Sequence, residues 1–409
     1  MREELYRDAQ TIIGEAIAAV SPDEAVRRAL EGKRFAGKSR LVAVGKAAWQ
    51  MARAALECLE EPTAGGIVLT KYGHVKGPLP GIRCLEAGHP VPDENSYRGT
   101  REVLRFTENL TEEDTVLFLL SGGGSALFEQ PLIPARETEE ITRQLLACGA
   151  DITEMNTVRK RLSGVKGGRF AAHCAPARVE AVVLSDILGD PLDMIAGGPV
   201  TPDTGTFARA REIIQTYGIA LSAEGWEALA REAPGPVTNV HTQIIGSVGQ
   251  LCQAARESCA RLGYETIFLT DRLACEAREA GRFLASVAAS HAGCGRKLAF
   301  VAGGETLVHL TGKGLGGRNQ ELALAAVQSL EGLDAAVFSV GSDGTDGPTD
   351  AAGGYVDGDT AAVLRERNIR PAQALADNDS YHALQAAGGL LVTGPTGTNV
   401  NDLTVVLVG

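Results

Sequence analysis

The stretch RLVAVGKAAWQMARAALECLEEPTAGGIVLT, residues 40–70, decides the fold of the chain. It reads as a strand over 40–45, a helix over 47–60 and a second strand over 65–70. The alternation continues through a helical pattern at 101–110, a strand at 115–120, a helical pattern at 138–149 and a strand at 177–185. Strands that alternate with helices predict βαβ units and a parallel sheet. The nearly continuous apolar runs TVLFLL and VEAVVLS fit strands that are buried on both faces.

A second α/β region follows the Pro-rich break APGP at 233–236. Strand patterns restart at 239–247 and recur at 264–270, 297–305, 335–342 and 402–408, with helical patterns between them. We therefore expect two α/β domains, residues 1–236 and 237–409. An amphipathic helix is expected over 2–20, and the sequence leaves open which domain it packs against.

Composition and charge exclude several classes of protein. The 409 residues include 39 Lys+Arg and 51 Asp+Glu, a formal net charge of −12, which argues against a nucleic-acid partner. The apolar runs fall far short of the ~20 residues of a membrane-spanning helix, and the charged N-terminus does not resemble a secretion signal. The eight cysteines contain no C-x-x-C pair, which argues against a zinc cage or a disulfide frame. We expect a cytoplasmic protein with free thiols.

Two stretches match nucleotide-binding motifs by letter. GKRFAGKS at 32–39 fits the P-loop pattern, but a helical pattern precedes it and a strand follows it, the reverse of the order that a P-loop needs. GKGLGG at 312–317 fits GxGxxG and does lie between a strand pattern and a helical pattern. A dinucleotide site also requires an acidic residue about 20 residues further on, and the nearest acids, Glu331 and Asp334, come too early. NAD(P) binding is therefore the alternative interpretation.

Polar residues follow two of the predicted parallel strands. Lys46 comes directly after the strand 40–45, where open α/β sheets bind ligands, and its ammonium can pair with a phosphate or a carboxylate. The strand 115–120 is followed by a glycine-rich loop whose backbone N–H groups can approach an anion. The residues of this loop are Ser121, Gly122, Gly123, Gly124 and Ser125.

Cations and carboxylates follow further along the same half of the chain. NTVRKRLSGVKGG at 156–168 is rich in cations, and helical spacing puts Asn156, Arg159 and Lys160 on one face, where they could neutralise an anionic substrate. For Arg161, in the same stretch, a solvated helix face is the alternative. Asp186 and Asp190 follow the strand 177–185 and could hold Mg²⁺ or accept a hydroxyl proton, although one of them could be an ordinary helix cap.

The second domain carries its own polar loops. Gly304 and Glu305 follow one strand, and Asp343 follows another in GSDGTDGPTD at 341–350. Thr396 and Asn399 stand in a loop just past the strand pattern LLVT. Hydroxyl, amide and carboxylate groups at these positions suit a nucleotide or a sugar-like ligand, while a plain turn explains the Gly-Pro step at 394–395 equally well.

Together these motifs resemble the class II glycerate kinases, whose C-terminal half is called the MOFRL domain. The resemblance runs through nearly the whole chain. It rests on GKAA around Lys46, EAGHPVPD (86–93), SGGGSALF (121–128), NTVRKRLSGVKGG (156–168), SDILGDP (185–191), IAGGPVTPD (195–203), GGETLVHLTGKGLGGRNQE (303–321), GSDGTDGPTDAAGG (341–354) and GPTGTNVNDL (394–403).

The resemblance implies a Rossmann-like domain with a mostly parallel sheet, a second α/β domain with a mixed sheet, and an active site in the cleft between them. It also implies ATP-dependent phosphorylation of D-glycerate, usually at the 2-hydroxyl, with Mg²⁺ or another divalent cation. Lys46 and Arg318 fall at the family's Lys and Arg motif positions and are the first candidates for catalysis.

Related sequences have also carried the name hydroxypyruvate reductase, so an NAD(P)H-dependent reductase is the alternative. The sequence leaves open whether the protein is a monomer or a homodimer.

Overall fold

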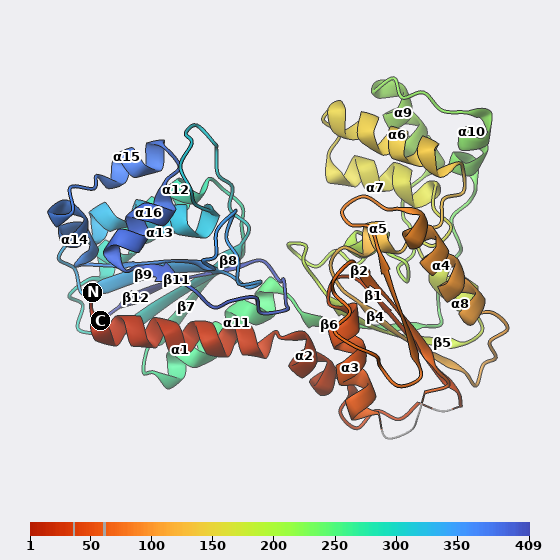
Figure 1. Ribbon diagram of the computed structural model, residues 1–409, viewed down its shortest axis with the longest axis horizontal. Helices are drawn as coiled ribbons and strands as arrows, with labels where there is room; N and C mark the ends of the chain where they lie inside the picture. The colour runs from red at the N-terminus through yellow and green to blue at the C-terminus, as the bar shows by residue number, and fades with distance from the viewer. Residues whose placement is uncertain (36, 60–62) are drawn as a thin grey trace. The chain divides into compact units, whose positions relative to one another are not determined.

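The computed structural model describes residues 1–35, 37–59 and 63–409. The chain forms two compact units (Figure 1). The first-sheet unit comprises Ala25–Ser185 and Asp190–Ile245. The second-sheet unit comprises Met1–Glu24, Asp186–Gly189 and Gly246–Gly409. Each unit is built around one six-stranded sheet, which confirms the prediction of two α/β domains.

The first sheet has the strand order β3-β2-β1-β4-β5-β6. The strands from β1 to β5 pair in parallel register. This order is that of a Rossmann-type sheet, and it reverses between β1 and β4. β4 is buried along its whole length, as the apolar run TVLFLL predicts. The strands are β1 (Ser39–Val44), β2 (Gly66–Lys71), β3 (Ile82–Ala87), β4 (Thr115–Leu120), β5 (Arg178–Leu184) and β6 (Val240–Gly246).

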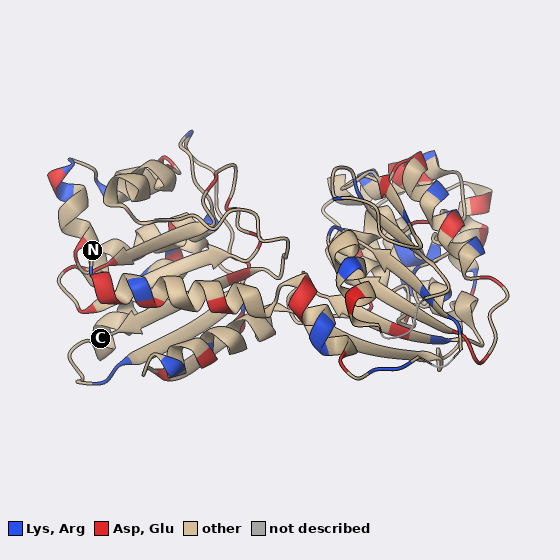
Figure 2. Ribbon diagram, turned by 60° about the horizontal axis from the view of Figure 1, so that its bottom comes forward, with Lys and Arg blue, Asp and Glu red and all other residues tan. Residues whose placement is uncertain are grey.

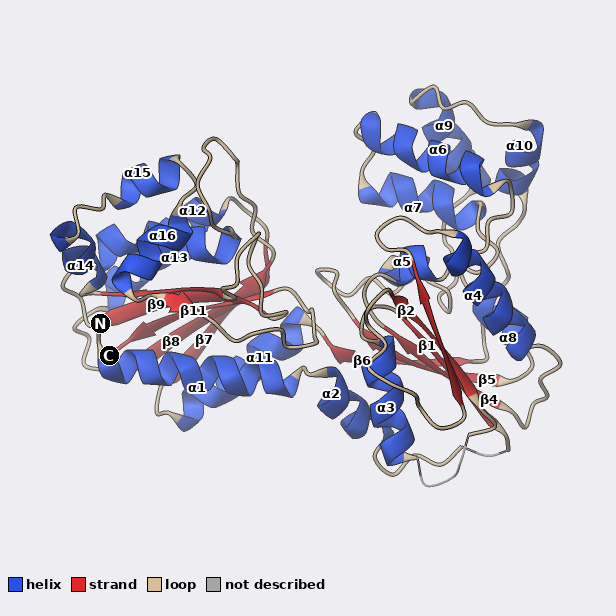
Figure 3. Ribbon diagram, in the orientation of Figure 1, coloured by secondary structure: helices blue, strands red, loops and turns tan. Residues whose placement is uncertain are grey.

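Helices cover the first sheet and add a further layer (Figure 3). α3 packs against β1 and β2, α4 against β2 and β3, and α8 against β5. A separate group of helices, α6, α7, α9 and α10, encloses an apolar cluster that includes Ile141, Val158 and Ile213. The helices are α2 (Pro22–Leu30), α3 (Ala48–Cys58), α4 (Glu94–Phe106), α5 (Gly124–Leu127), α6 (Ala135–Ala147), α7 (Ile152–Arg161), α8 (Arg169–Cys174), the 3₁₀ turn η1 (Ile195–Gly197), α9 (Phe207–Thr216) and α10 (Ala223–Ala230).

The second sheet is mixed, with the order β11-β10-β9-β12-β8-β7. The last strand of the chain, β12, lies in the middle of the sheet and runs antiparallel to both β8 and β9. β7 pairs with β8 in parallel, and β10 is antiparallel to β9 and β11. The strands are β7 (Glu265–Leu273), β8 (Leu298–Gly304), β9 (Ala335–Gly341), β10 (Gly353–Asp357), β11 (Leu390–Leu391) and β12 (Asp402–Val408).

Helices also cover both faces of the second sheet. α1 and α11 lie on one face, and α12, α13 and α16 lie on the other (Figure 3). α1 is held here by the ring of Tyr6, 5.0 Å from that of Tyr355, and by Asp8, which accepts a hydrogen bond of 2.7 Å from the Tyr264 hydroxyl. The helices are α1 (Glu3–Ala19), α11 (Val248–Arg261), α12 (Ala277–His291), α13 (Arg318–Leu330), α14 (Thr360–Glu366), α15 (Pro371–Ala376) and α16 (Ser380–Ala387).

The observed units differ from the predicted domains in three places. Residues 1–24 and 186–189 belong to the second-sheet unit although they precede position 236. The predicted strand 239–247 was assigned to the second domain, whereas β6 flanks β5 in the first sheet, where the backbone N–H of Val179 donates to the carbonyl of Asn239 at 2.8 Å. The partner of a strand depends on pairing with residues that are distant in the chain, so the local Pro-rich break at 233–236 does not predict which sheet the next strand joins.

The P-loop-like stretch 32–39 joins α2 to β1, so the helix precedes and the strand follows, as the sequence analysis expected. Residue 36 of this stretch lies outside the described residues. None of the eight cysteines forms a disulfide, and burial raises the pKa of Cys174, Cys252 and Cys259 to about 12.

The described residues contain neither a candidate membrane-spanning helix nor a cluster of metal-binding side chains. No helix there is long and apolar enough to cross a membrane. No group of three or more His, Cys, Asp or Glu among the described residues could hold a metal ion.

Figure 2 shows acidic and basic residues side by side along α1 and on the helices of the first-sheet unit.

Candidate active site

The carboxyl ends of β1 to β4 carry polar and cationic residues. Lys46 follows β1, Lys71 ends β2, His89 follows β3, and the glycine-rich loop 121–125 follows β4. Because these strands are parallel neighbours, their ends meet along one line, called here the carboxyl edge of the first sheet. The strand order reverses between β1 and β4, and open α/β sheets bind ligands at such a reversal. The structure therefore brings Lys46 and the glycine-rich loop together.

Backbone contacts lock Lys46 onto the glycine-rich loop. The N–H of Lys46 donates to the Gly122 carbonyl at 2.8 Å, and the N–H of Ala47 donates to the Ser121 hydroxyl at 3.1 Å. Gly45 has a φ of 118°, and a β-carbon there would collide with Ser121, so only glycine permits this approach. The Lys46 carbonyl accepts from Nδ1 of His74 at 2.8 Å.

The glycine-rich loop is also fixed from the opposite side. Gly123 is left-handed, with a φ of 85°, and it precedes the four-residue helix α5. The Ser125 carbonyl accepts hydrogen bonds from Nζ of Lys166 at 3.0 Å and from Arg159 at 3.4 Å. Lys166 is buried and pairs with Glu129 at 2.7 Å, and burial lowers the pKa of its ammonium. Two cationic side chains thus hold the far end of the loop, Lys166, which is paired with Glu129, and Arg159.

Helix α7 distributes its three predicted anion-binding residues unequally. Arg159 is half-buried and reaches the glycine-rich loop. Lys160 is buried and lies 2.9 Å from the Asp193 carboxylate and 3.8 Å from that of Asp203, so its charge is compensated within the unit. Asn156 is buried as well. Of the three residues, Arg159 therefore has the contact that connects α7 to the loop.

The two predicted metal ligands belong to different units. Asp190 lies in the first-sheet unit in the left-handed region, with a φ of 52°, and its buried Oδ1 has no hydrogen-bond partner among the described residues. Asp186 lies in the second-sheet unit, where its carbonyl accepts from the amide of Asn401 at 3.3 Å. A metal ion shared by the two carboxylates remains a prediction.

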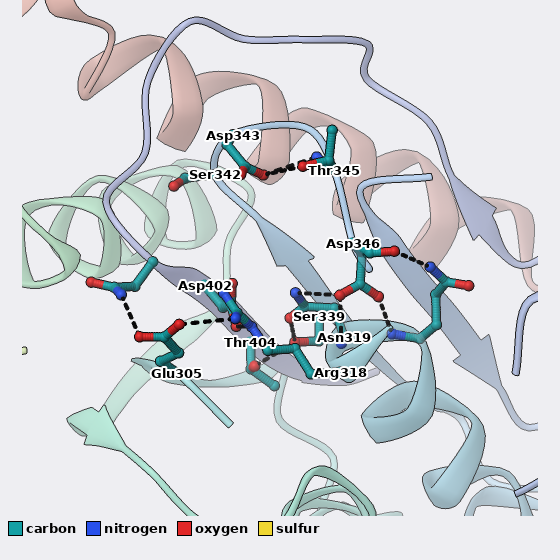
Figure 4. Close-up of polar contacts among 12 residues, drawn as sticks. Glu305, Arg318, Asn319, Ser339, Ser342, Asp343, Thr345, Asp346, Asp402 and Thr404 are labelled. Atoms are coloured by element: carbon teal, nitrogen blue, oxygen red, sulfur yellow. Dashed lines mark hydrogen bonds and ion pairs between the residues drawn. The ribbon is translucent and has the colours of Figure 1, made fainter. Parts of the chain in front are cut away.

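In the second-sheet unit, Arg318 is held between two carboxylates (Figure 4). Its Nε and Nη2 donate to Asp402 at 2.6 and 2.9 Å, and its Nη1 donates to Glu305 at 3.0 Å. Burial raises the pKa of the Asp402 carboxyl. Burial alone would lower the pKa of Arg318, but the hydrogen bond and charge of Asp402 outweigh burial and raise it. The guanidinium is therefore permanently charged and fixed in orientation.

The remaining predicted nucleotide-binding residues lie on three loops near Arg318. Glu305 accepts a second hydrogen bond from Asn401 at 3.3 Å, and Gly304 precedes it at the end of β8. The Asp343 carboxylate accepts from the N–H of Thr345 at 2.9 Å, and the Asp343 carbonyl accepts from the N–H of Thr396 at 3.2 Å. Asn399 accepts from the N–H of Asn401 at 3.5 Å.

A cavity of about 820 Å³ in the second-sheet unit joins several of these groups. Its wall contains Glu305, Arg318 and Asp343, the loop 312–317 and apolar side chains including Leu307 and Leu310. Gly304, Thr396 and Asn399 are not part of the wall. The combination of the cations Arg318 and Lys313, polar groups and apolar side chains suits a ligand with both a charged and an apolar part.

Backbone N–H groups of the GxGxxG stretch at 312–317 and of the start of α13 are already bonded to acidic side chains of the same unit. The N–H groups of Asn319 and Gln320, at the start of α13, donate to the Asp346 carboxylate at 3.1 and 2.9 Å. The N–H groups of Lys313 and Leu315 donate to Asp377 and Asp379, each at 3.1 Å. The glycines of the stretch allow close packing against the loop 377–380 of the same unit. Because N–H groups of the stretch are bonded to this loop and not available to a pyrophosphate, the structure argues against the NAD(P) interpretation.

Sequence reasoning assigned no role to two of the residues that this geometry singles out. His89 lies in the motif EAGHPVPD, and its importance becomes visible only once β3 is known to end two residues before it. Asp346 lies in the stretch GSDGTDGPTD, and its cap on α13 depends on packing between distant segments.

Comparisons with known proteins cover the whole chain. Residues 8–230 match a family described as "Domain of unknown function (DUF4147)", and residues 298–402 match the MOFRL family. The chain is 51% identical to a D-glycerate 2-kinase of Thermotoga maritima over 99% of both chains. It is 41% identical to a glycerate 2-kinase of Pyrococcus horikoshii over 97% of this chain and 96% of that protein. A crystal structure of a glycerate kinase from Thermotoga maritima matches with a TM-score of 0.97 and 50% identity, covering 100% of each chain.

Asp346 makes the stability of the protein depend on pH in a defined direction. Burial raises its pKa from 3.8 to about 6, in spite of the hydrogen bonds from α13. The folded protein therefore binds this proton more tightly than the unfolded chain, so the contribution of Asp346 to the free energy of unfolding falls as the pH rises from about 4 to about 6. Asp346→Asn does not titrate. The unfolding free energy of the wild type minus that of the variant should decrease by about 2 to 3 kcal/mol over this interval.

Urea unfolding of both proteins at matched pH values measures this difference. The contributions of the other carboxyl groups largely cancel, because both proteins contain them. Parallel stability curves for the two proteins between about pH 4 and 6 would contradict the assignment.

Proposed function

Because the chain belongs to the class II glycerate kinase family, we propose that it transfers the γ-phosphoryl group of ATP to the 2-hydroxyl of D-glycerate, giving 2-phosphoglycerate and ADP. The observation that carries this proposal is the near-full-length similarity to the D-glycerate 2-kinase of Thermotoga maritima. The site chemistry supports it independently, since both units present fixed cations beside polar loops. Phosphoryl transfer requires mainly positioning and neutralisation of charge.

Lys46 and the glycine-rich loop are proposed to bind the anionic groups of the substrates. No described carboxylate pairs with the Lys46 ammonium, in contrast to Lys160 and Lys166. Lys71, at the next strand end, adds a second positive charge to the same edge. A cation without an internal counterion attracts a phosphate or a carboxylate more strongly than one that is already paired.

Arg318 is proposed to stabilise the charge of the transferring phosphoryl group. A guanidinium has five N–H groups. Three of them in Arg318 are bonded to Asp402 and Glu305, which leaves two for a phosphate. Because the carboxylates hold the guanidinium in place before the substrate arrives, little orientational freedom is lost on binding. We propose that the nucleotide also contacts Gly304, Glu305, Asp343, Thr396 and Asn399.

Mg²⁺ fits one described group on chemical grounds. The unpartnered, buried Oδ1 of Asp190 is a hard oxygen ligand whose desolvation is not otherwise compensated. Asp190 is therefore the residue that would hold the ion, with Asp186 as the second candidate. The bound ion would supply positive charge to the phosphates.

An assay with D-glycerate, ATP and Mg²⁺ tests the proposal. NMR of the product distinguishes 2-phosphoglycerate from 3-phosphoglycerate, and parallel reactions contain hydroxypyruvate with NADH or NADPH. We expect ATP-dependent 2-phosphoglycerate and no oxidation of the nicotinamide. Nicotinamide turnover without a phosphorylated product would instead establish the reductase.

Loss of the Lys46 ammonium should remove most of the activity. Lys46→Ala is expected to lower kcat by about 10²- to 10³-fold, since a preorganised charge near the reacting phosphate is lost. Lys38→Ala is the matched control, because Lys38 is exposed and precedes the same strand that Lys46 follows. Steady-state kinetics of both variants measure the effect. Turnover of Lys46→Ala within a few-fold of the wild type would rule out this role.

Asp402 should act through Arg318. Asp402→Asn removes the charge that orients the guanidinium, so kcat should fall by about 10²-fold while the fold is retained. Glu331→Gln is the control. Glu331 is an exposed carboxylate that pairs with Arg365, and it follows the C-terminal end of α13, whereas Arg318 begins this helix. If Asp402→Asn folds and turns over at the wild-type rate, Asp402 does not position Arg318 for catalysis.

A further inference from the structure

His89 lies directly against the glycine-rich loop. A β-carbon placed on Gly123 would be 2.9 Å from Cδ2 and 3.1 Å from Nε2 of His89, and 3.2 Å from Cγ of Lys46. The edge of the imidazole ring and the Lys46 side chain therefore both border the bare backbone of Gly123. Since a larger residue at 123 would displace both groups, the glycine allows an imidazole and an ammonium to reach the same point of the carboxyl edge.

The segment that carries His89 is held firmly. Asp93 caps α4 by accepting the N–H of Ser96 at 3.0 Å, and the Tyr72 hydroxyl donates to the same carboxylate at 2.6 Å. A β-carbon on Gly88 would lie 2.7 Å from the Val91 carbonyl oxygen, so the turn before α4 is tightly closed. The segment that carries His89 is thus positioned by contacts with Tyr72, just after β2, and with the start of α4.

The surroundings of His89 favour the neutral imidazole. His89 is half-buried, and neither ring nitrogen makes a hydrogen bond to any residue that the structure describes. The charged and titratable groups that act on it are Lys46 after β1, and Lys71 and His74 at the end of β2 and in the loop beyond it. Burial and these positive charges lower the pKa of His89 below the ordinary value for histidine. At neutral pH the ring has an unoccupied lone pair that can accept a proton.

We propose that His89 is the general base that accepts the proton of the D-glycerate hydroxyl. This assignment rests on the proposed function. As the hydroxyl oxygen forms its bond to the γ-phosphorus, the bond between that phosphorus and the β,γ-bridging oxygen breaks, and its electron pair leaves with ADP. The hydroxyl proton passes to the free ring nitrogen of His89 and is later released to water. A neutral imidazole is a stronger base than an ordinary carboxylate, and a base with a pKa near the operating pH is the most effective.

The test compares the pH dependence of kcat/KM in the wild type and in His89→Gln from about pH 4 to 8, a range extended to the acidic side of ordinary histidine titration because the pKa of His89 is lowered. The wild type should lose activity at acidic pH as the imidazole becomes protonated. His89→Gln should lower kcat by about 10²-fold, change KM little, and no longer show this acidic decline. His241→Gln is the matched control, because His241 is a half-exposed histidine of the same unit that pairs with Glu180 on β5.

Several outcomes would overturn the assignment. A wild-type profile without an acidic decline would do so whether or not the variant folds. If His89→Gln still loses activity at acidic pH, a group other than His89, such as Asp190, accepts the hydroxyl proton. His89 would then only support the structure of the site. If the wild type does not phosphorylate glycerate at all, both the proposed function and the assignment of His89 are wrong. If the wild type is active and the pH profile of His89→Gln is the same as that of the wild type, only the assignment of His89 is wrong.

Discussion

The hydrogen bond from the backbone N–H of Lys46 to the Gly122 carbonyl joins two strand ends of a parallel sheet, and the candidate site of the first-sheet unit depends on it. Parallel pairing brings the carboxyl ends of β3, β2, β1 and β4 to one edge, and the reversal of strand order between β1 and β4 opens that edge to a ligand. A β-carbon on Gly45 would collide with Ser121, and one on Gly123 would crowd His89 and the Lys46 side chain, so both positions require glycine. Three otherwise independent loops then present a lysine, a histidine and bare backbone amides in one place.

In the second-sheet unit, the charge of a partly buried guanidinium, that of Arg318, is balanced by neighbouring carboxylates. Arg318 and Asp402 form a bidentate pair, and Glu305 takes a third N–H of the guanidinium. Without Asp402, the partly buried guanidinium would keep only the exposed Glu305 as a counterion and would lose its bidentate contact. The arrangement therefore holds the guanidinium in one orientation. Asp346 performs the corresponding task for the first N–H groups of α13, which would otherwise lack partners.

Two motifs with matching letters turn out to depend on context. The P-loop-like stretch joins a helix to a strand in the wrong order, and the GxGxxG stretch donates its N–H groups to acidic side chains of the same unit. Glycine spacing reports that two chain segments approach each other closely, but it does not report what approaches. In the GxGxxG stretch the partners are the loop 377–380 and, at Gly317, Asp346. At Gly123 it is His89 together with Lys46, a pairing that no letter pattern announces.

The sequence alone determined the α/β class, the two sheets, the strand ends that carry Lys46 and the glycine-rich loop, and the family resemblance. These features depend on local hydrophobic periodicity and on residues that are close together in the chain. Only the tertiary structure decided that α1 packs in the second-sheet unit, that β6 completes the first sheet, that Asp186 and Asp190 belong to different units, and that Asp402 orients Arg318. Each of these depends on pairing between residues that are distant in the chain, where burial and complementary charge select the partner and local pattern carries no information about it.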